Sequence, residues 1–405
     1  MKILQINTSY INGGSTGRIV YDLSQVIQKE NIESYVGFGY EYVQTNDVNT
    51  YKIETIPELK LSILKTRLFG KHGFYNKGVT RNFLDWVDKI KPDVIHLHNL
   101  HNHYLNIEIL FEYIKKHDIP VVWTLHDCWS FTGWCAYFDY SNCDKWLTGC
   151  HNCPSLRDYP YTWFFDRSKE IYNDKAKIFG DVNNLTIITP SNWLAKLVKQ
   201  SILKEYVVKV INNGIDLMAF KPTASDFRKN NGLENKIIVL AMAMQLNKRK
   251  GVDYLLRLPA LLSDDYCLVL VGIEESQRKF LPAKNCIGIK KTNNIDELVQ
   301  IYSASDMFVN PTLEDNFPTT NLEALACGTP VITFNTGGSP ESVDESVGVV
   351  VKKGSMDELV NAIKKVSEIG KEKYTALCVE RANLYYGKEK QYLKYIEEYK
   401  LLTNL

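Results

Sequence analysis

Short apolar runs alternate with helix-like stretches along the whole chain, and this alternation restricts the fold more than any other feature of the sequence. Apolar runs that are continuous, rather than interrupted at every second residue, are typical of strands buried on both faces of a parallel sheet. The runs fall into two sets, which cover 3–6, 94–97, 121–125, 185–188 and 207–211, and then 237–242, 267–271, 307–309, 331–333 and 347–351. The pattern therefore predicts an α/β protein with two parallel sheets, each covered by helices.

A turn-rich stretch, Asn212–Asp216, separates the two sets. A chain of 405 residues has room for two or three domains. We therefore predict an N-terminal domain over 1–212 and a C-terminal domain over 213–370. The segment 371–405 has a helical pattern without a strand, and we expect it to be a helix that packs back toward the N-terminal domain.

The charges of the chain nearly cancel, with 48 Lys and Arg against 47 Asp and Glu and a formal net charge of +1. A general nucleic-acid binder carries a basic surplus, so this balance argues against a nucleic-acid partner. The N-terminal sequence MKILQIN lacks the apolar run of a signal peptide, and no stretch approaches the ~18–20 apolar residues of a membrane span. We therefore expect a cytoplasmic protein.

A glycine-rich segment after the first strand contains Gly13, Gly14 and Ser15 and opens a helix. Glycines let the backbone approach a ligand closely, and the N–H groups at a helix N-terminus attract anions. The spacing Gly-Gly-x-x-Gly differs from the dinucleotide fingerprint, and a plain strand-to-helix turn is the alternative.

Three consecutive cations, Lys248, Arg249 and Lys250, precede Gly251 and follow the strand at 237–242. Ligands bind at the carboxyl ends of strands in open parallel sheets, where cations can neutralise a diphosphate. A solvated run of charges is the alternative interpretation.

The most informative segment is 311–330, in which a loop with Glu314 and Asp315 joins a strand to a helix that ends at a glycine. Pro318 suits the first turn of that helix. Backbone N–H groups at the start of the helix would bind phosphate, while Asp315 and Glu323 would bind hydroxyl groups of the same ligand. Alternatively, Glu323 only favours the helix dipole, which is worth ~0.3–1 kcal/mol.

Histidines follow two strands of the first set. His126 and Asp127 come after the strand at 121–125, and His98 comes after the strand at 94–97. Because parallel strands end at the same edge of a sheet, we expect His126 to face the cleft between the domains. A structural histidine at a strand end is the alternative.

Four of the nine cysteines lie in a non-periodic insertion over 128–160, namely Cys135, Cys143, Cys150 and Cys153. The final Cys-x-x-Cys favours a structural zinc ion held by four thiolates, which would stabilise a loop without a core of its own. The irregular spacing upstream leaves free thiols as the alternative.

A basic segment over 59–71 places Leu61, Leu64 and Leu68 on one helical face, close to several lysines and arginines. Such a helix can lie on a membrane that contains anionic lipids, or it can pack its apolar face on the core. The sequence leaves both interpretations open.

The run from Glu314 to Pro330, together with Lys250-Gly251 and Asn213–Asp216, resembles the retaining glycosyltransferases of family 4, which have the GT-B fold. The resemblance covers nearly the whole chain. It implies two Rossmann-like domains that face each other across a cleft. It also implies a nucleoside-diphosphate sugar donor held mostly by the C-terminal domain and an acceptor held by the N-terminal domain.

The resemblance further implies roles for single residues. The family has two conserved-spacing acids at this loop and helix. The first is a glutamate that contacts the donor sugar, and Asp315 takes its place here. The second contacts the ribose and corresponds to Glu323. Lys250 matches the family's lysine, whereas Gln245 stands in place of an arginine. His126 corresponds to a histidine near the donor sugar. These implied catalytic residues are joined by donor-binding residues Gly14, Arg249, Glu314, Asn316, Phe317, Pro318, Thr319, Thr320 and Asn321, and by acceptor-side residues Gly13, Ser15, His98 and Asp127.

The implied reaction moves a sugar from a nucleoside diphosphate to a hydroxyl group of a glycan acceptor, free or lipid-linked, with retention of the anomeric configuration. Cell-surface polysaccharide synthesis is the expected setting, and no cofactor is expected to take part in catalysis. Two alternatives stay open: a sugar-nucleotide epimerase of the same architecture, and a non-catalytic sugar-nucleotide-binding module.

Overall fold

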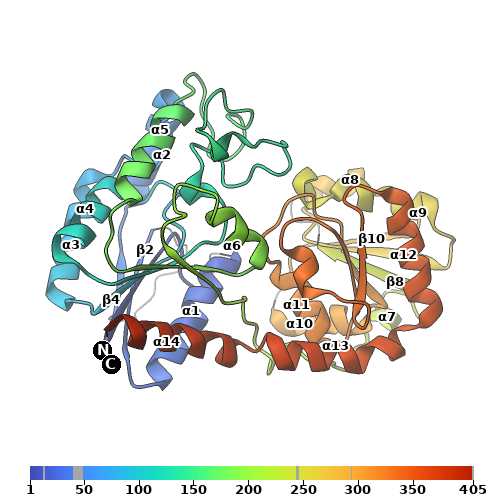
Figure 1. Cartoon of the computed structure of the whole chain (residues 1–405). Coiled ribbons are helices and arrows are strands. Elements are labelled where there is room, and N and C mark those ends of the chain that lie inside the picture. The colour runs from blue at the N-terminus through green and yellow to red at the C-terminus, as the bar shows by residue number, and fades with distance from the viewer. Residues whose placement is uncertain (12–13, 40–48, 243–245, 293, 404–405) are drawn as a thin grey trace. The chain divides into compact units, whose positions relative to one another are not determined.

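The computed structural model describes the chain except residues 12–13, 40–48, 243–245, 293 and 404–405. The described residues form two compact units. Unit 1 contains Met1–Asn212 and Gln391–Leu405, and unit 2 contains Asn213–Lys390. Figure 1 shows a sheet and its helices in each unit.

Unit 1 is built on a seven-stranded sheet in the order β3-β2-β1-β4-β5-β6-β7, in which every neighbouring pair is parallel. The strands are β1 (Lys2–Asn7), β2 (Glu33–Phe38), β3 (Thr50–Lys52), β4 (Val94–Leu97), β5 (Val121–Thr124), β6 (Leu185–Thr189) and β7 (Val207–Val210). The helices are α1 (Gly14–Lys29), α2 (Ile56–Phe69), α3 (Lys77–Ile90), α4 (Ile107–His117), α5 (Ser168–Phe179), α6 (Asn192–Val198) and most of α14 (Lys388–Thr403).

Unit 2 is built on a six-stranded parallel sheet in the order β10-β9-β8-β11-β12-β13. The strands are β8 (Ile237–Met242), β9 (Tyr266–Val271), β10 (Cys286–Ile289), β11 (Met307–Asn310), β12 (Val331–Phe334) and β13 (Gly348–Val351). The helices are α7 (Phe227–Asn230), α8 (Val252–Leu255), α9 (Leu258–Leu261), α10 (Ile295–Ala304), α11 (Thr319–Ala326), α12 (Met356–Ile369) and α13 (Lys371–Tyr385). The prediction of two parallel α/β sheets is confirmed.

Each sheet reverses its strand order at one point, between β1 and β4 in unit 1 and between β8 and β11 in unit 2. The central strands are buried along their whole length, as their continuous apolar sequences predict. Loops on either side of such a reversal point diverge, so a crevice opens at the carboxyl ends of the two strands. The topology therefore marks one candidate ligand site in each unit.

The C-terminal segment 371–405, expected as one helix, divides into α13 and α14 around Gly387. The backbone of Ile215 causes this break, because its N–H donates to the Tyr386 carbonyl at 2.8 Å and its carbonyl accepts from the Lys388 N–H at 2.9 Å. These two bonds take backbone groups away from a continuous helical ladder. Helix α14 then contributes Tyr392, Tyr395, Ile396 and Tyr399 to a buried cluster in unit 1.

Helix α14 also satisfies a buried polar group of the unit 1 sheet. His96 on β4 is fully buried, and its Nδ1 lies 2.6 Å from the Tyr399 hydroxyl while its Nε2 lies 2.8 Å from Thr124 Oγ1. Burial lowers the pKa of His96 well below its usual value, so the ring is neutral and needs both partners.

Among the described residues, we find no helix that combines the length and apolar character needed to cross a bilayer.

We predict that Tyr399→Phe lowers the free energy of unfolding by about 1–3 kcal/mol, because it leaves the buried Nδ1 of His96 without a partner. The control is Tyr21→Phe on α1, a half-buried tyrosine of the same unit. Urea unfolding of both variants measures the difference. Equal stabilities would show that the Tyr399–His96 contact contributes nothing.

Candidate functional site

The reversal point of unit 2 brings two oppositely charged segments together. The turn η4 (Lys248–Lys250) follows β8, and the loop 311–318 follows β11. Lys250 Nζ lies 2.5 Å from Asp315 Oδ2, and Arg249 Nη1 lies 3.5 Å from Glu314 Oε1. The four charged side chains that the sequence places in this site are therefore neighbours.

Gly251 allows the turn and the loop to approach each other this closely. Its φ of +77° is left-handed, and a Cβ atom at this position would lie 1.9 Å from the Pro311 carbonyl oxygen. The Leu313 N–H donates to the Arg249 carbonyl at 2.9 Å across the same contact. Only glycine fits both the backbone conformation and the space.

Gly337 lies against the other side of the loop 311–318, close to the backbone of Asp315. Its φ is +57°, and a Cβ atom there would lie 1.8 Å from the Asp315 carbonyl oxygen. The Asp315 side chain is fixed at both oxygens, because Oδ1 accepts from the Asn316 N–H at 3.0 Å and Oδ2 is paired with Lys250. The carboxylate is thus held in one orientation before any ligand arrives.

Helix α11 begins at Thr319 beside this pair, after Pro318. The first N–H groups of a helix have no intrahelical carbonyl partner, so the N–H groups of Thr319 and Thr320 offer positive charge to an anion. The preceding residues are buried, with Phe317 packed on the Tyr386 ring at a centroid distance of 5.9 Å, and Asn316 is buried as well.

The side chain of Asn321 is buried and bonded within the protein, and it does not face a ligand. Its N–H donates to the Pro318 carbonyl at 3.2 Å, and its buried side chain accepts from Asn310 Nδ2 at 2.8 Å. Its Nδ2 also donates to Ser339 and Ser342 hydroxyls, each at 3.1 Å. These bonds fix the start of α11 against the neighbouring loop.

Glu323 lies in the next turn of α11 and is partly exposed. Its Oε2 accepts from the Tyr302 hydroxyl at 3.1 Å, and the same hydroxyl reaches the Thr320 carbonyl at 3.4 Å. A carboxylate held by a tyrosine keeps lone pairs for hydroxyl groups of a ligand.

In unit 1, a second group of polar side chains lies at the carboxyl ends of β4 and β5. His98, His101, His126 and Asp127 line one pocket together with Trp129 and other residues. His98 Nδ1 lies 3.1 Å from His126 Nε2, and the two rings are stacked with 13° between their planes. The positions predicted for His98, His126 and Asp127 are therefore adjacent.

The protonation states in this pocket follow from burial and pairing. Burial lowers the pKa of His126 to about 4 and that of His98 well below its usual value, so both rings are neutral. Burial also opposes the charge of Asp127, but His101, whose Nε2 lies 2.8 Å from Asp127 Oδ2, brings the pKa of the carboxyl below its usual value. The pocket thus presents the neutral rings of His98 and His126 beside the carboxylate of Asp127.

The pairing of His101 with Asp127 is the part of this pocket that sequence reasoning missed. The two residues lie 26 positions apart on different loops. The signal available in the sequence was that each follows one of two adjacent strands, which end at the same edge of the sheet.

The N-terminal glycine segment is described only in part. Gly13 lies outside the described residues, whereas Gly14 starts α1 with a φ of +77° and is exposed, as is Ser15. Gln245, the residue in place of the expected arginine, also lies outside the described residues.

Comparison with known proteins matches both halves of the chain to related families. Residues 16–218 match the family described as Glycosyltransferase Family 4, and residues 223–382 match Glycosyl transferases group 1. A protein of Escherichia coli K12 named as a colanic acid biosynthesis glycosyl transferase, WcaC, is 30% identical over 387 residues, which cover 90% of each chain. The chain belongs to glycosyltransferase family 4.

Solved structures agree with this membership at the level of the fold. Sucrose-phosphate synthase from Thermosynechococcus elongatus has a TM-score of 0.70 at 17% identity and covers 99% of both chains. HepE from Anabaena, in complex with UDP-glucose, has a TM-score of 0.67 at 17% identity and covers 100% of both chains. The glycosyltransferase therefore has the GT-B fold, and as a family 4 member it is a retaining enzyme that uses a nucleotide-sugar donor.

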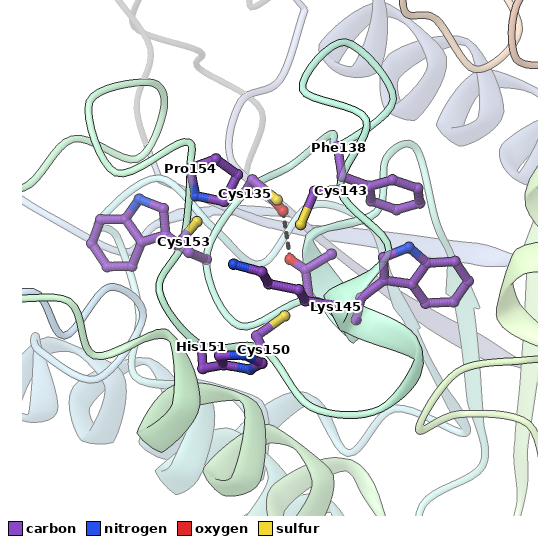
Figure 2. Close-up of a pocket in the computed structure, with 11 residues that line it drawn as sticks. Cys135, Phe138, Cys143, Lys145, Cys150, His151, Cys153 and Pro154 are labelled. Carbon is purple, nitrogen blue, oxygen red and sulfur yellow. Dashed lines mark hydrogen bonds between the residues drawn. The ribbon is translucent and has the colours of Figure 1, made fainter.

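The expectation of a structural zinc ion in this glycosyltransferase is not supported. Figure 2 shows Cys135, Cys143, Cys150 and Cys153 around one pocket, but no three or more His, Cys, Asp or Glu residues in the described parts of the chain are placed to hold a metal ion. Cys150 Sγ accepts a hydrogen bond from the Gly133 N–H at 3.1 Å.

Aromatic side chains line the same pocket as these thiols. Burial raises the pKa of Cys150 to about 11, so this thiol is neutral when no metal ion is bound. Aromatic packing stabilises the insertion, with Phe138 stacked on Trp146 at 5.0 Å and Phe131 at 5.4 Å from the same ring.

We predict that Gly251→Ala destabilises unit 2 and weakens donor binding, because the Cβ atom would push the loop at Pro311 away from the turn. The matched control is Gly232→Ala, whose φ of +64° is also left-handed but whose Cβ would meet no atom within 4 Å. The control carries only the backbone cost of about 1–2 kcal/mol. Thermal unfolding and donor titration measure how much more stability and donor affinity Gly251→Ala loses than Gly232→Ala. Equal losses in the two variants would show that the close approach of Gly251 to Pro311 is not the cause.

Proposed function

We propose that this glycosyltransferase transfers a sugar from a nucleoside-diphosphate sugar to a hydroxyl group of a glycan acceptor in cell-surface polysaccharide synthesis. One observation carries the proposal: Lys250 and Arg249 lie against Asp315 and Glu314 at the reversal point of unit 2, beside the start of α11. A site with cations, helix N–H groups and fixed carboxylates matches a ligand that joins a diphosphate to hydroxyl groups. The relative WcaC supports the biological setting through its name.

In this proposal, unit 2 binds the donor. Lys250, Arg249 and the N–H groups of Thr319 and Thr320 bind the diphosphate. Asp315 orients the sugar, and Glu323 binds the ribose hydroxyl groups. Because HepE is a fold relative solved with UDP-glucose, a uridine diphosphate sugar is the donor class we propose.

The reaction breaks the bond between the anomeric carbon and the diphosphate oxygen, and it forms a bond from the acceptor oxygen to the same face of that carbon. The acceptor proton goes to the departing phosphate oxygen. Negative charge grows on the diphosphate as the sugar becomes oxocarbenium-like, so the cations at Lys250 and Arg249 stabilise the transition state more than the ground state.

Unit 1 binds the acceptor in this proposal, with Gly13, Ser15, His98 and Asp127 on the acceptor side. His98 is held at both ring nitrogens, by His126 Nε2 at 3.1 Å and by Gln5 Oε1 at 3.2 Å, so in this proposal a sugar hydroxyl group replaces one of these partners. The charged carboxylate of Asp127 can accept a hydrogen bond from a hydroxyl group of the acceptor. We propose that His126 contacts the donor sugar, that the acceptor is lipid-linked, and that the enzyme works in the cytoplasm.

The central test is Lys250→Ala. We predict a loss of roughly 10²–10³ in turnover, because one charge-stabilising donor at the leaving group is removed. The matched control is Lys284→Ala, an exposed lysine of the same unit, which should keep full activity. Full activity of Lys250→Ala would remove Lys250 from the mechanism.

The same assay separates transfer from its alternatives. With a uridine diphosphate sugar and a glycan acceptor, NMR of the product should show the anomeric configuration of the donor. Conversion of the donor to an isomeric nucleotide sugar without acceptor would instead show an epimerase. Donor-induced stabilisation without turnover would show a binding module.

We also predict that EDTA leaves the transfer rate unchanged, because positive charges of the protein neutralise the diphosphate in place of a divalent ion. The measurement compares initial rates before and after chelation and dialysis. A loss of activity that Mg²⁺ or Mn²⁺ restores would contradict this prediction.

A further inference from the structure

Helix α5 of unit 1 carries a lysine in the middle of its buried face. The buried residues of the helix are Ser168, Ile171, Lys175 and Phe179, which lie on one side at helical spacing. Lys175 is 0% exposed. Folding alone favours an apolar side chain at such a position, because an ammonium group loses its hydration when it is buried. The packing of the helix therefore does not explain the lysine.

The amino group of Lys175 binds one short turn, η1 (Trp129–Phe131), and the residue that follows it. Its Nζ donates to the Trp129 carbonyl at 2.5 Å and to the Thr132 carbonyl at 3.1 Å. The same nitrogen lies 3.5 Å from the centroid of the Trp129 ring, which is a cation–π contact when the lysine is charged. Lys175 thus contacts both the backbone and the side chain of Trp129.

The two hydrogen bonds of Lys175 do not depend on one protonation state. Burial lowers the pKa of Lys175 to about 7. The ammonium form has three N–H donors and the neutral amine has two, so either form can donate to both carbonyls. The lysine therefore holds the turn whether or not it is charged.

The turn that Lys175 holds comes directly after Asp127, the carboxylate of the pocket in unit 1. The Trp129 N–H donates to Asp127 Oδ1 at 2.9 Å, while Asp127 Oδ2 lies 2.8 Å from His101 Nε2. The rings of Trp129 and His101 pack together, with their centroids 5.6 Å apart. Trp129, His101 and Asp127 also line the pocket together. The position of Trp129 therefore affects both hydrogen bonds that orient the carboxylate.

A close backbone contact holds the other end of the turn against α5. A Cβ atom at Gly133 would lie 2.1 Å from the Ser168 carbonyl oxygen, so only glycine allows this approach. Replacing Lys175 would remove the bonds of α5 to the Trp129 end of the turn, whereas the contact at Gly133 would stay in place. The expected effect of such a replacement is therefore local to the segment that begins at Asp127.

We propose that Lys175 is a positioning residue of the acceptor pocket. It fixes Trp129, and Trp129 fixes the Asp127 carboxylate in the orientation that binds a hydroxyl group of the acceptor. Because Lys175 is buried, it acts through Trp129 and not on the substrate itself. The assignment of the pocket to the acceptor rests on the proposed function, whereas the effect of Lys175 on the turn rests on the contacts within unit 1.

The first measurement of the test needs no substrate. Amide hydrogen exchange of the full chain, followed by mass spectrometry, should be at least about fivefold faster over residues 127–132 in Lys175→Met than in the wild type, because methionine cannot donate to the two carbonyls. Lys175→Gln should show a smaller increase, since its amide keeps an N–H donor. Unchanged exchange over this segment in both variants would overturn the proposal.

The second measurement separates the acceptor from the donor. It follows transfer from UDP-glucose to a panel of p-nitrophenyl glycosides, and hydrolysis of UDP-glucose by water without an acceptor. In Lys175→Met we expect the KM for the acceptor to rise about tenfold, while the KM for UDP-glucose and the rate of hydrolysis stay at their wild-type values. An unchanged KM for the acceptor would overturn the proposal, even if hydrogen exchange is faster.

Two controls on the same helix separate positioning from stability. Lys177→Met changes an exposed lysine and should leave both measurements at their wild-type values. Ile171→Ala removes a buried side chain from the same face as Lys175, so it should lower the thermal unfolding midpoint without raising the KM for the acceptor. An equal rise in this KM in Ile171→Ala and Lys175→Met would show that Lys175 only stabilises the fold, and would overturn the proposal.

The two measurements also distinguish this proposal from the proposed function. If the wild type transfers no sugar to any glycoside of the panel, the result counts against the proposed function. Hydrogen exchange over residues 127–132 then decides alone whether Lys175 fixes the turn beside Asp127.

Discussion

The contact between the turn at Lys250 and the loop at Asp315 organises the site in unit 2. Gly251 permits it, because any side chain at that position would collide with the Pro311 carbonyl. The backbone bond from Leu313 to Arg249 then fixes the register of turn and loop. The charged side chains and the start of α11 are arranged by this one close approach.

Most of the fold can be predicted from the sequence. Continuous apolar strands such as β4 and β5 have one stable environment, a parallel sheet covered on both faces, and both sheets are found. The turn and the loop of unit 2 are also predictable, because each follows a recognisable strand and carries charge. The break at Gly387 is not, since it depends on backbone bonds to Ile215, which lies far away in the chain.

Other features depend on partners that a linear pattern does not contain. The leucine spacing of α2 is the same whether the stripe faces in or out; in the structure Thr66 is buried, and Leu61 and Leu64 are exposed. The thiol spacing likewise suits zinc, but the spacing alone does not fix the positions of the four side chains, which line one pocket without a metal-binding geometry among the described residues. The pairing of His101 with Asp127 arises only where the ends of two strands meet.

The ion pair of Lys250 and Asp315 has a consequence for the chemistry we propose. Without ligand, the carboxylate neutralises the ammonium group, so neither group carries the full cost of an unpaired charge in a partly buried place. When a diphosphate arrives, the ammonium group is shared between phosphate and carboxylate. The carboxylate then has lone pairs free for the sugar hydroxyl groups while Asn316 still holds its other oxygen. Binding of the diphosphate and orientation of the sugar are thereby coupled through one lysine.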